Sequence, residues 1–246
     1  MQNLFFDEVD FSGKKLILIC VPYGGGWSTI FNSWEPYLEP EIALLSAKFP
    51  GRGERMEEPS YENMQELVQE ISPVIGAYEL PIVFYGGCFG GLCAYEIIKE
   101  LQETYHKKVK HFFTNSLISP RYIEEKVFLS QWSKEELADE LLRRGELPEE
   151  VLGDEEVLEF LLPGIRADYK IYENYRYQEK GKINVDMSIF YNDSAVLRQE
   201  ADKDWEHLIQ GSCERIPMAC DNLFAAESQI EIAKQINSKL KQLYLN

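Results

Sequence analysis

Residues 81–91 read P-I-V-F-Y-G-G-C-F-G-G. The apolar run predicts a buried strand, and the helical periodicity of residues 89–104 predicts that a helix follows the motif G-x-C-x-G directly. Such a sharp strand-to-helix turn presents its central side chain, Cys88, at the helix N-terminus, where the helix dipole and unpaired N–H groups stabilise a thiolate. Gly86 and Gly90 permit the strained turn and the close packing of helix on strand. The alternative is a glycine-rich turn that carries an inert, buried cysteine.

The same alternation of strand and helix extends along the chain. Short apolar runs predict strands at residues 15–21, 42–49, 81–85, 109–115 and 185–191. Longer periodic segments predict helices at 28–38, 61–79, 89–104 and near 226–244. Strands that alternate with helices form βαβ units, so we predict an α/β fold with a central, mostly parallel sheet in a single domain, residues 1–246.

One segment breaks this alternation. Residues 121–177 are rich in Glu, Leu and Tyr and contain helical runs but no apolar strand pattern. Ser133 and Glu136 have the spacing of a capping box, and Gly145 is suited to end the helix that they begin. We therefore predict a helical insertion at 121–177 that acts as a lid over the carboxyl edge of the sheet.

Composition excludes several classes of protein. The chain has 246 residues, 45% of them hydrophobic, which is enough to build a substantial core. Its net charge of −17 argues against nucleic acid or an anionic membrane as partner, although Arg52 and Arg55 are candidates for a small basic patch. Its apolar runs are too short to cross a membrane, and its first residues are acidic where a signal peptide would be basic. We expect a cytoplasmic protein and a monomer.

The cysteines and histidines are few. The five cysteines show no C-x-x-C spacing, so we expect reduced thiols and no metal site, with Cys93 an ordinary core residue. The three histidines are His106, His111 and His207. None of them follows a predicted strand in the way a catalytic histidine would, so we expect them to serve packing or the surface.

Four stretches together resemble one family, the type II thioesterases that accompany nonribosomal peptide and polyketide synthases. They are L-I-C-V-P-Y-G-G-G (18–26), F-P-G-R-G-E-R (49–55), G-G-C-F-G (86–90) and L-P-G-I-R-A-D-Y-K-I-Y-E-N-Y-R-Y (162–177). They stand in the family's order and cover nearly the whole chain. The third departs from the family's usual G-H-S-M-G, because cysteine replaces serine and glycine replaces histidine.

The resemblance implies an α/β-hydrolase fold and an enzyme that acts on acyl groups held on the phosphopantetheine arm of a carrier protein. The chain itself would then need no cofactor. Family members use a Ser-Asp-His triad, and the matching positions here are Cys88 for the nucleophile and Asp193 for the acid. The backbone N–H groups of Gly24 and Phe89 would form the oxyanion hole. Trp205 resembles a tryptophan that follows the family's acid.

The family's histidine is missing from the matching stretch. The family's G-G-H-F-F-L corresponds to M-A-C-D-N-L-F (218–224), which puts Asn222 at the histidine position, or Asp221 if the register slips by one residue. Asp193 would then hold this loop through a hydrogen bond, and Asn222 would orient an incoming nucleophile. The plainer alternative is that both residues are remnants of a lost triad.

A cysteine tolerates this loss better than a serine does. An unperturbed thiol is already a few per cent thiolate at neutral pH, and exchange between thiol and thioester needs no base. Attack by water does need one. We therefore expect an acyl-Cys88 intermediate and acyl transfer rather than efficient hydrolysis. Two alternatives remain: a catalytically silent accessory that binds a carrier protein or synthase, and other α/β-hydrolase chemistry such as amide formation or cyclisation.

Overall fold

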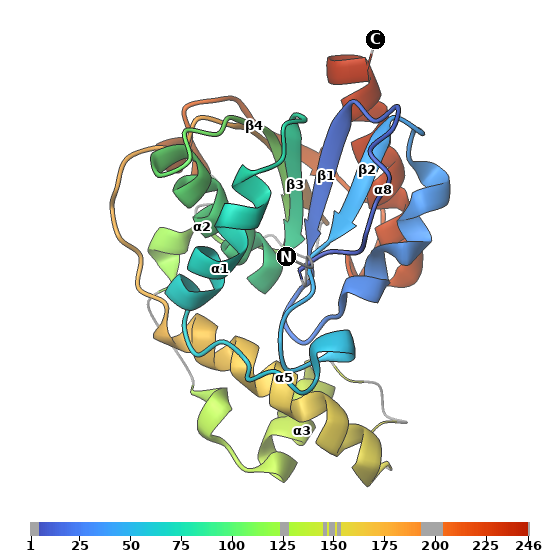
Figure 1. Ribbon diagram of the computed structural model, residues 1–246. Coiled ribbons are helices and arrows are strands. Elements are labelled where there is room, and N and C mark those ends of the chain that lie inside the picture. Colours follow the sequence, from blue (N-terminus) through green and yellow to red (C-terminus); the bar gives the residue numbers. More distant parts are fainter. Residues whose placement is uncertain are drawn as a thin grey trace.

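The computed structural model describes residues 5–123, 128–144, 147, 151, 154–192 and 204–245. These residues form a central sheet covered by helices on both faces (Figure 1). Two further helices, α3 (Lys134–Arg143) and α5 (Glu155–Asn174), lie beyond the carboxyl ends of the strands. The prediction of an α/β architecture with a parallel sheet is confirmed.

Six parallel strands make up the sheet in the described part of the chain. They are β1 (Leu16–Val21), β2 (Ile42–Ser46), β3 (Ile82–Gly87), β4 (Val109–Asn115), β5 (Asp186–Tyr191) and β6 (Cys213–Pro217). Their order is β2-β1-β3-β4-β5-β6. The chain runs outward from β1 to β2 and then returns across β1 to β3, so the order reverses between β1 and β3. Ligands of open α/β sheets bind at the carboxyl ends of the strands at such a switch point.

Both faces of the sheet are buried. Along β1, Ile17, Ile19 and Val21 point into one hydrophobic cluster, while the alternate residues Leu18 and Cys20 point into another. Helices α1 (Met64–Gly76) and α2 (Phe89–Glu103) cover the first face. The 3-10 helix η1 (Ser28–Tyr37) and the helix α8 (Ala226–Leu240) cover the second. This two-sided burial explains why the strands read as continuous apolar runs.

The remaining described elements are short. They are η2 (Gly53–Arg55), η3 (Pro120–Tyr122), η4 (Leu129–Gln131), α7 (Trp205–Leu208) and the π-helical turn η6 (Lys241–Leu245).

Two elements differ from the prediction. Residues 28–37 wind as a 3-10 helix: Pro36 lies inside it and lacks the N–H that a longer α-helix needs, and no side chain caps its start. The sixth strand, β6, was not predicted. Its sequence C-E-R-I-P is mixed in polarity and its side chains are only partly buried, unlike those of β2 at the other edge of the sheet.

The described residues of segment 121–177 form helices and no strand of the sheet. Many of their apolar side chains make a third hydrophobic cluster, in which Leu137 and Leu141 of α3 meet Leu162 of α5. Near the end of α5, Ile171 belongs instead to the first cluster that flanks the sheet. The capping box of Ser133 and Glu136 is confirmed. Gly145 lies outside the described residues.

His111 predicts how stability depends on pH. Its side chain is buried in β4 and shares a 2.8 Å hydrogen bond between Nε2 and the Ser188 hydroxyl, which donates to Glu214. Burial, with a contribution from Lys239, lowers the pKa of the imidazole from 6.5 to about 4, although Asp186 and Glu214 oppose the shift. Between these two pH values His111 binds a proton in the unfolded chain but stays neutral in the folded protein. The free energy of unfolding therefore falls as the pH falls. We expect His111 to account for a loss of about 3 kcal/mol between about pH 7 and pH 4.

The measurement is urea unfolding of the wild type and His111→Gln across this pH range. Carboxylates also titrate in acid, so the difference between the two proteins isolates the histidine. The advantage of the wild type should shrink by about 3 kcal/mol towards pH 4. Parallel stability curves would show that His111 does not stay neutral in the fold.

Candidate functional site

Cys88 occupies the sharp turn between β3 and α2. It is the N-cap of α2, with φ 50° and ψ −119°, a conformation that a non-glycine residue rarely adopts. Its N–H donates to the carbonyl of Asn115 at 2.9 Å, and its own carbonyl accepts from Leu92 at 3.1 Å. The side chain is exposed. The predicted strand-to-helix turn is therefore confirmed, and the alternative of a buried cysteine is wrong.

Two glycines are needed because backbones approach closely around the turn. A Cβ on Gly86 would lie 2.5 Å from the carbonyl oxygen of Gly90. A Cβ on Gly90 would lie 2.3 Å from the carbonyl oxygens of Val21 and Pro22. Only glycine fits at either place, and the start of α2 consequently packs directly on the chain that leaves β1.

The two residues whose backbone N–H groups are predicted to form an oxyanion hole, Gly24 and Phe89, are neighbours in the fold. A Cβ on Gly24 would lie 3.6 Å from the Cβ of Phe89, so the loop after β1 meets the first turn of α2. Within this loop, Gly26 donates its N–H to Tyr23 and Gly25 donates to Asp168, both at 2.8 Å. The N–H of Gly24 makes no hydrogen bond to any described residue. The N–H of Phe89 stands at the first helical position, where it has no partner within the helix.

Asp193 is the predicted acid, and Asn222 is the residue predicted to stand at the histidine position. Asp193 lies outside the described residues. Asn222 is exposed, and its Oδ1 accepts the N–H of Phe224 at 2.8 Å, so its side chain closes a local turn. The side chain that ties this loop to the end of β5 is Asn192, which donates to the carbonyl of Asp221 at 2.8 Å. Sequence reasoning missed Asn192, because an asparagine one residue before an expected acid carries no recognisable signal.

Aromatic and amide groups fill the space beside the turn. A Cβ on Gly87 would lie 2.4 Å from Oδ1 of Asn115 and 2.9 Å from the ring of Phe224. Phe224 packs edge-on against Tyr23, with ring centroids 4.9 Å apart. The loop that contains Asn222 thus reaches the residue before Cys88. The same packing leaves no room for the histidine that the thioesterase motif has at position 87.

The histidines lie elsewhere in the fold. His111 pairs in register with Val83, four residues before Gly87, so it lies about 13 Å back along the sheet from the turn. His106 precedes β4 and belongs to the same, amino-terminal edge. His207 is in α7, with its ring 3.4 Å from Asp204.

The other cysteines contrast with Cys88. Cys20 and Cys93 are fully buried, and burial raises the pKa of both thiols well above the usual value. This confirms Cys93 as a core residue. Cys213 and Cys220 are partly buried.

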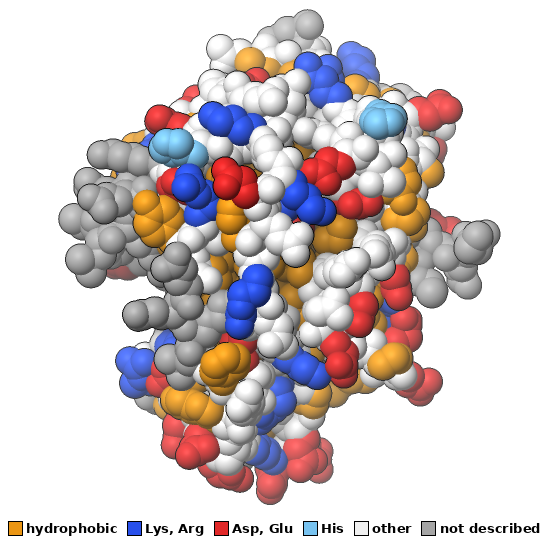
Figure 2. Space-filling model, turned by 90° about the vertical axis from the view of Figure 1, so that its left-hand side faces the viewer, with side chains coloured by type: hydrophobic (Ala, Val, Ile, Leu, Met, Phe, Trp, Pro, Cys, Tyr) orange, Lys and Arg blue, Asp and Glu red, His pale blue; other side chains and the backbone are white. Residues whose placement is uncertain are grey.

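Charge is distributed in a way that the sequence did not reveal. Arg52 and Arg55 are each only 6% exposed and are ion-paired, to Asp168 and Glu58 respectively, so the prediction of a basic surface patch there is wrong. On the described part of the face shown in Figure 2, Lys and Arg side chains alternate with Asp and Glu side chains.

A pocket of about 380 Å³ lies away from the turn, between α1, α2 and residues 174–180. Its lining on α2 begins at Glu96, about two helical turns (~12 Å) beyond Cys88. Glu96 is paired with Lys99 at 2.9 Å and accepts from Tyr175 at 2.7 Å, so these charges are satisfied within the protein. Among the described residues, no cluster of His, Cys, Asp and Glu is arranged to hold a metal, and no helix is long and apolar enough to span a membrane.

Comparison with known proteins finds a family model and relatives that match most of the chain. A family model described as Thioesterase domain matches residues 16–240. The gramicidin S biosynthesis protein GrsT of Aneurinibacillus migulanus is 28% identical over 236 residues, which cover 94% of this chain and 91% of GrsT. The linear gramicidin dehydrogenase LgrE of Brevibacillus parabrevis is 26% identical over 239 residues, 94% of this chain and 89% of LgrE. The name of LgrE denotes a dehydrogenase, yet the dinucleotide-binding fingerprint G-x-G-x-x-G does not occur in this sequence.

A solved structure gives the same fold. The type II thioesterase BorB from the borrelidin biosynthetic cluster superposes with a TM-score of 0.86 at 24% sequence identity, covering 98% of this chain and 99% of BorB. This likeness, with the parallel sheet and the strand order, confirms the predicted α/β-hydrolase fold.

Proposed function

The chain belongs to the thioesterase domain family, and we propose that it acts on acyl thioesters carried by a partner protein, through an acyl intermediate on Cys88. The observation that carries the proposal is the exposed Cys88 side chain at the N-terminus of α2. A helix N-terminus favours the thiolate, which is the nucleophilic form of cysteine. A cysteine that served only the core would be buried, as Cys20 and Cys93 are.

The first step is exchange between thiolate and thioester. The Cys88 sulfur attacks the carbonyl carbon of the acyl group, and a tetrahedral oxyanion forms. The N–H groups of Gly24 and Phe89 donate to that oxygen; loss of one such donor typically costs about 10²–10³ in rate. The bond between the acyl carbon and the sulfur of the carrier then breaks, and the leaving thiolate takes a proton from solvent. The products are acyl-Cys88 and a carrier with a free thiol.

The second step is acyl transfer rather than efficient hydrolysis. Water must lose a proton as it attacks, and the residue that the family resemblance puts at the histidine position, Asn222, is not a base. A neutral amine attacks with less help and forms an amide, and the proton that it loses returns Cys88 to the thiol. The thiolate of a second carrier forms a new thioester and releases Cys88 as the thiolate. Asp193, which keeps the family's acid position, and Asn222 would orient the attacking group.

The proposed partner is an acyl or peptidyl carrier protein of nonribosomal peptide or polyketide biosynthesis, which supplies the acyl group on its phosphopantetheine arm. The name of GrsT and the biosynthetic cluster of BorB support this choice. We also propose that α3 and α5 act as the lid of this site. Their facing side chains form a hydrophobic cluster of their own, and both helices lie beyond the carboxyl ends of the strands (Figure 1). The last turns of α5 are anchored in the core of the sheet through Ile171.

Intact-protein mass spectrometry after mixing with acyl-loaded carrier proteins tests the proposal. We expect a mass gain equal to the acyl group and a matching loss from the carrier. Binding of the carrier without any adduct would instead support the accessory alternative. Turnover of small free esters without a carrier would support other α/β-hydrolase chemistry.

A further inference from the structure

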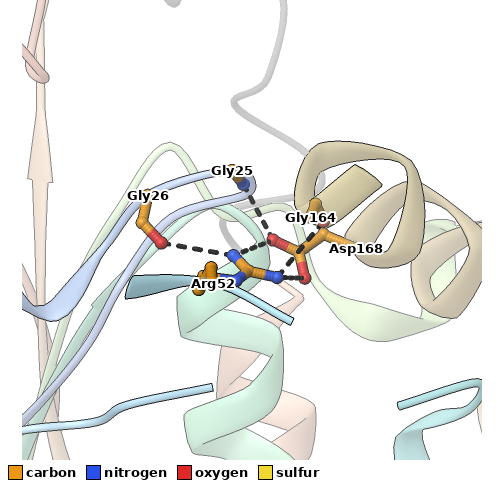
Figure 3. Close-up of polar contacts among 5 residues, drawn as sticks. All are labelled: Gly25, Gly26, Arg52, Gly164 and Asp168. Atoms are coloured by element: carbon orange, nitrogen blue, oxygen red, sulfur yellow. Dashed lines mark hydrogen bonds and ion pairs between the residues drawn. The ribbon is translucent and has the colours of Figure 1, made fainter. Parts of the chain in front are cut away.

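A single carboxylate joins helix α5 to the loop after β1. Oδ2 of Asp168, on α5, accepts the backbone N–H of Gly25 at 2.8 Å (Figure 3). The packing around this bond is tight, since a Cβ on Gly25 would lie 2.6 Å from the side chain of Ile165 on the same helix. The loop that contains Gly24 is therefore fixed against a helix more than a hundred residues away in the chain.

Arg52 closes the contact from a third segment, the loop after β2. Its Nη1 donates to Oδ2 of Asp168 at 2.7 Å and its Nη2 donates to Oδ1 at 2.6 Å, a bidentate pair. The same two nitrogens reach backbone carbonyls on both sides: Nη1 donates to Gly26 in the loop, and Nη2 donates to Gly164 on α5, each at 3.2 Å. Figure 3 shows the guanidinium plane lying between loop and helix.

The pair is buried, with side-chain exposures of 6% for Arg52 and 4% for Asp168. A buried ion pair is weak evidence for stability, because desolvation offsets most of its attraction. Its directional hydrogen bonds do specify geometry. The geometry specified here is that of the turn at residues 23–26, which Gly26 closes by donating to Tyr23 and which Gly25 enters with φ 75°.

We propose that Arg52 and Asp168 are positioning residues for the oxyanion hole, and that they make its assembly depend on α5 being seated. With the N–H of Gly25 and the carbonyl of Gly26 both held, the peptide of Gly24 has one orientation beside Phe89. If α5 lifts, Asp168 leaves Gly25 and the turn loses its support. Closure of α5 over a bound acyl group therefore orients the N–H of Gly24 towards the oxyanion. The inference rests on the proposed function, which assigns Gly24 its donor role.

Two reactions at Cys88 separate positioning from nucleophilicity. Alkylation by iodoacetamide displaces iodide and develops no oxyanion, whereas acylation by S-hexanoyl-N-acetylcysteamine does. Asp168→Asn keeps the shape but loses the charge, and an NH₂ group replaces the oxygen that accepts from Nη2 of Arg52, so the bidentate pair that holds the carboxylate against the loop is broken. Arg52→Lys keeps the charge but loses the fork, which provides a second variant if Asp168→Asn folds poorly.

We expect each variant to slow acylation by about 10- to 1,000-fold, because a misaimed donor approaches a missing one in effect. Alkylation should change by no more than about threefold. The matched control is Arg166→Gln on the same helix, because Arg166 donates to the carbonyls of Ser130 and Trp132 and makes no contact of this kind with the loop. It should leave both rates within about threefold of the wild type. Equal losses in both reactions, or unchanged acylation, would overturn the inference.

Hydrogen exchange distinguishes this inference from the proposed function. In Asp168→Asn, amide exchange should rise in residues 22–27 as well as in α5, while in Arg166→Gln it should not rise in residues 22–27. If the wild type itself forms no acyl adduct, the proposed function fails. Faster exchange in residues 22–27 would then still support the coupling of loop and helix, and unchanged exchange would refute it.

Discussion

Cys88→Ala is expected to abolish both the acyl adduct and the release of acyl groups from a loaded carrier. Residues 86–90 contain no other nucleophilic side chain, and backbone N–H groups cannot form a covalent intermediate by themselves. Intact-protein mass spectrometry should show no mass gain in the variant under conditions where the wild type is fully modified. The fold should persist, because the Cys88 side chain is exposed and alanine removes only the sulfur.

Cys88→Ser tests why a cysteine stands at this position. A serine hydroxyl needs a general base to attack, and general acid–base help is typically worth about 10²–10⁴ in rate. We therefore expect the serine variant to be almost as inactive as the alanine variant. Cys220→Ala is the control for non-specific modification, because Cys220 is a partly buried thiol in the loop beside the site. Near-normal activity of Cys88→Ser would mean that a base is present after all and that the cysteine mechanism is wrong.

Local pattern was sufficient to predict most of the fold. Five strands could be predicted because burial on both faces forces a continuous apolar run, and α2 because a glycine-rich turn precedes an amphipathic segment. The edge strand β6 lacked that signal, since its side chains are only partly buried and include Glu214 and Arg215. Its place in the sheet depends on pairing with β5, which no local pattern encodes.

In the candidate site, too, the local features were predictable from the sequence and the long-range contacts were not. The turn at Cys88 was predicted from the short motif at the end of β3, and the family resemblance led us to expect Gly24 near Phe89. The bonds of Asp168 to Arg52 and to the glycine loop were not predicted, because they join segments 116 and 143 residues apart. A charged residue in a motif is predicted to lie on the surface unless its ion-pair partner is known. Burial of the pair is a property of the assembled fold.

Position 222 is the proposed equivalent of the histidine in the family's triad. Its loop is held on both sides: Asn192 donates to the carbonyl of Asp221 at 2.8 Å, and Gln229 donates to the carbonyl of Leu223 at 2.6 Å. Phe224 in the same loop packs against Gly87, the residue before Cys88. Asn222 itself is exposed and its side chain accepts one local hydrogen bond, from the N–H of Phe224, so its replacement should cost only about 1 kcal/mol of stability.

Asn222→His is expected to convert slow deacylation into hydrolysis. An imidazole that reaches the water attacking acyl-Cys88 would accept its proton, so the lifetime of the adduct should fall by about 10²-fold or more. The rate should rise with pH through the imidazole pKa of about 6.5, which a purely structural change would not cause. Pre-acylated protein, freed of carrier and followed by mass spectrometry at several pH values, provides the measurement.

Asn222→Gln is the matched control without a base, and Asp221→His tests the alternative register. If Asn222→Gln loses its acyl group as fast as Asn222→His, the substitutions only loosen the loop. Position 222 would then not be equivalent to the histidine of the family's triad.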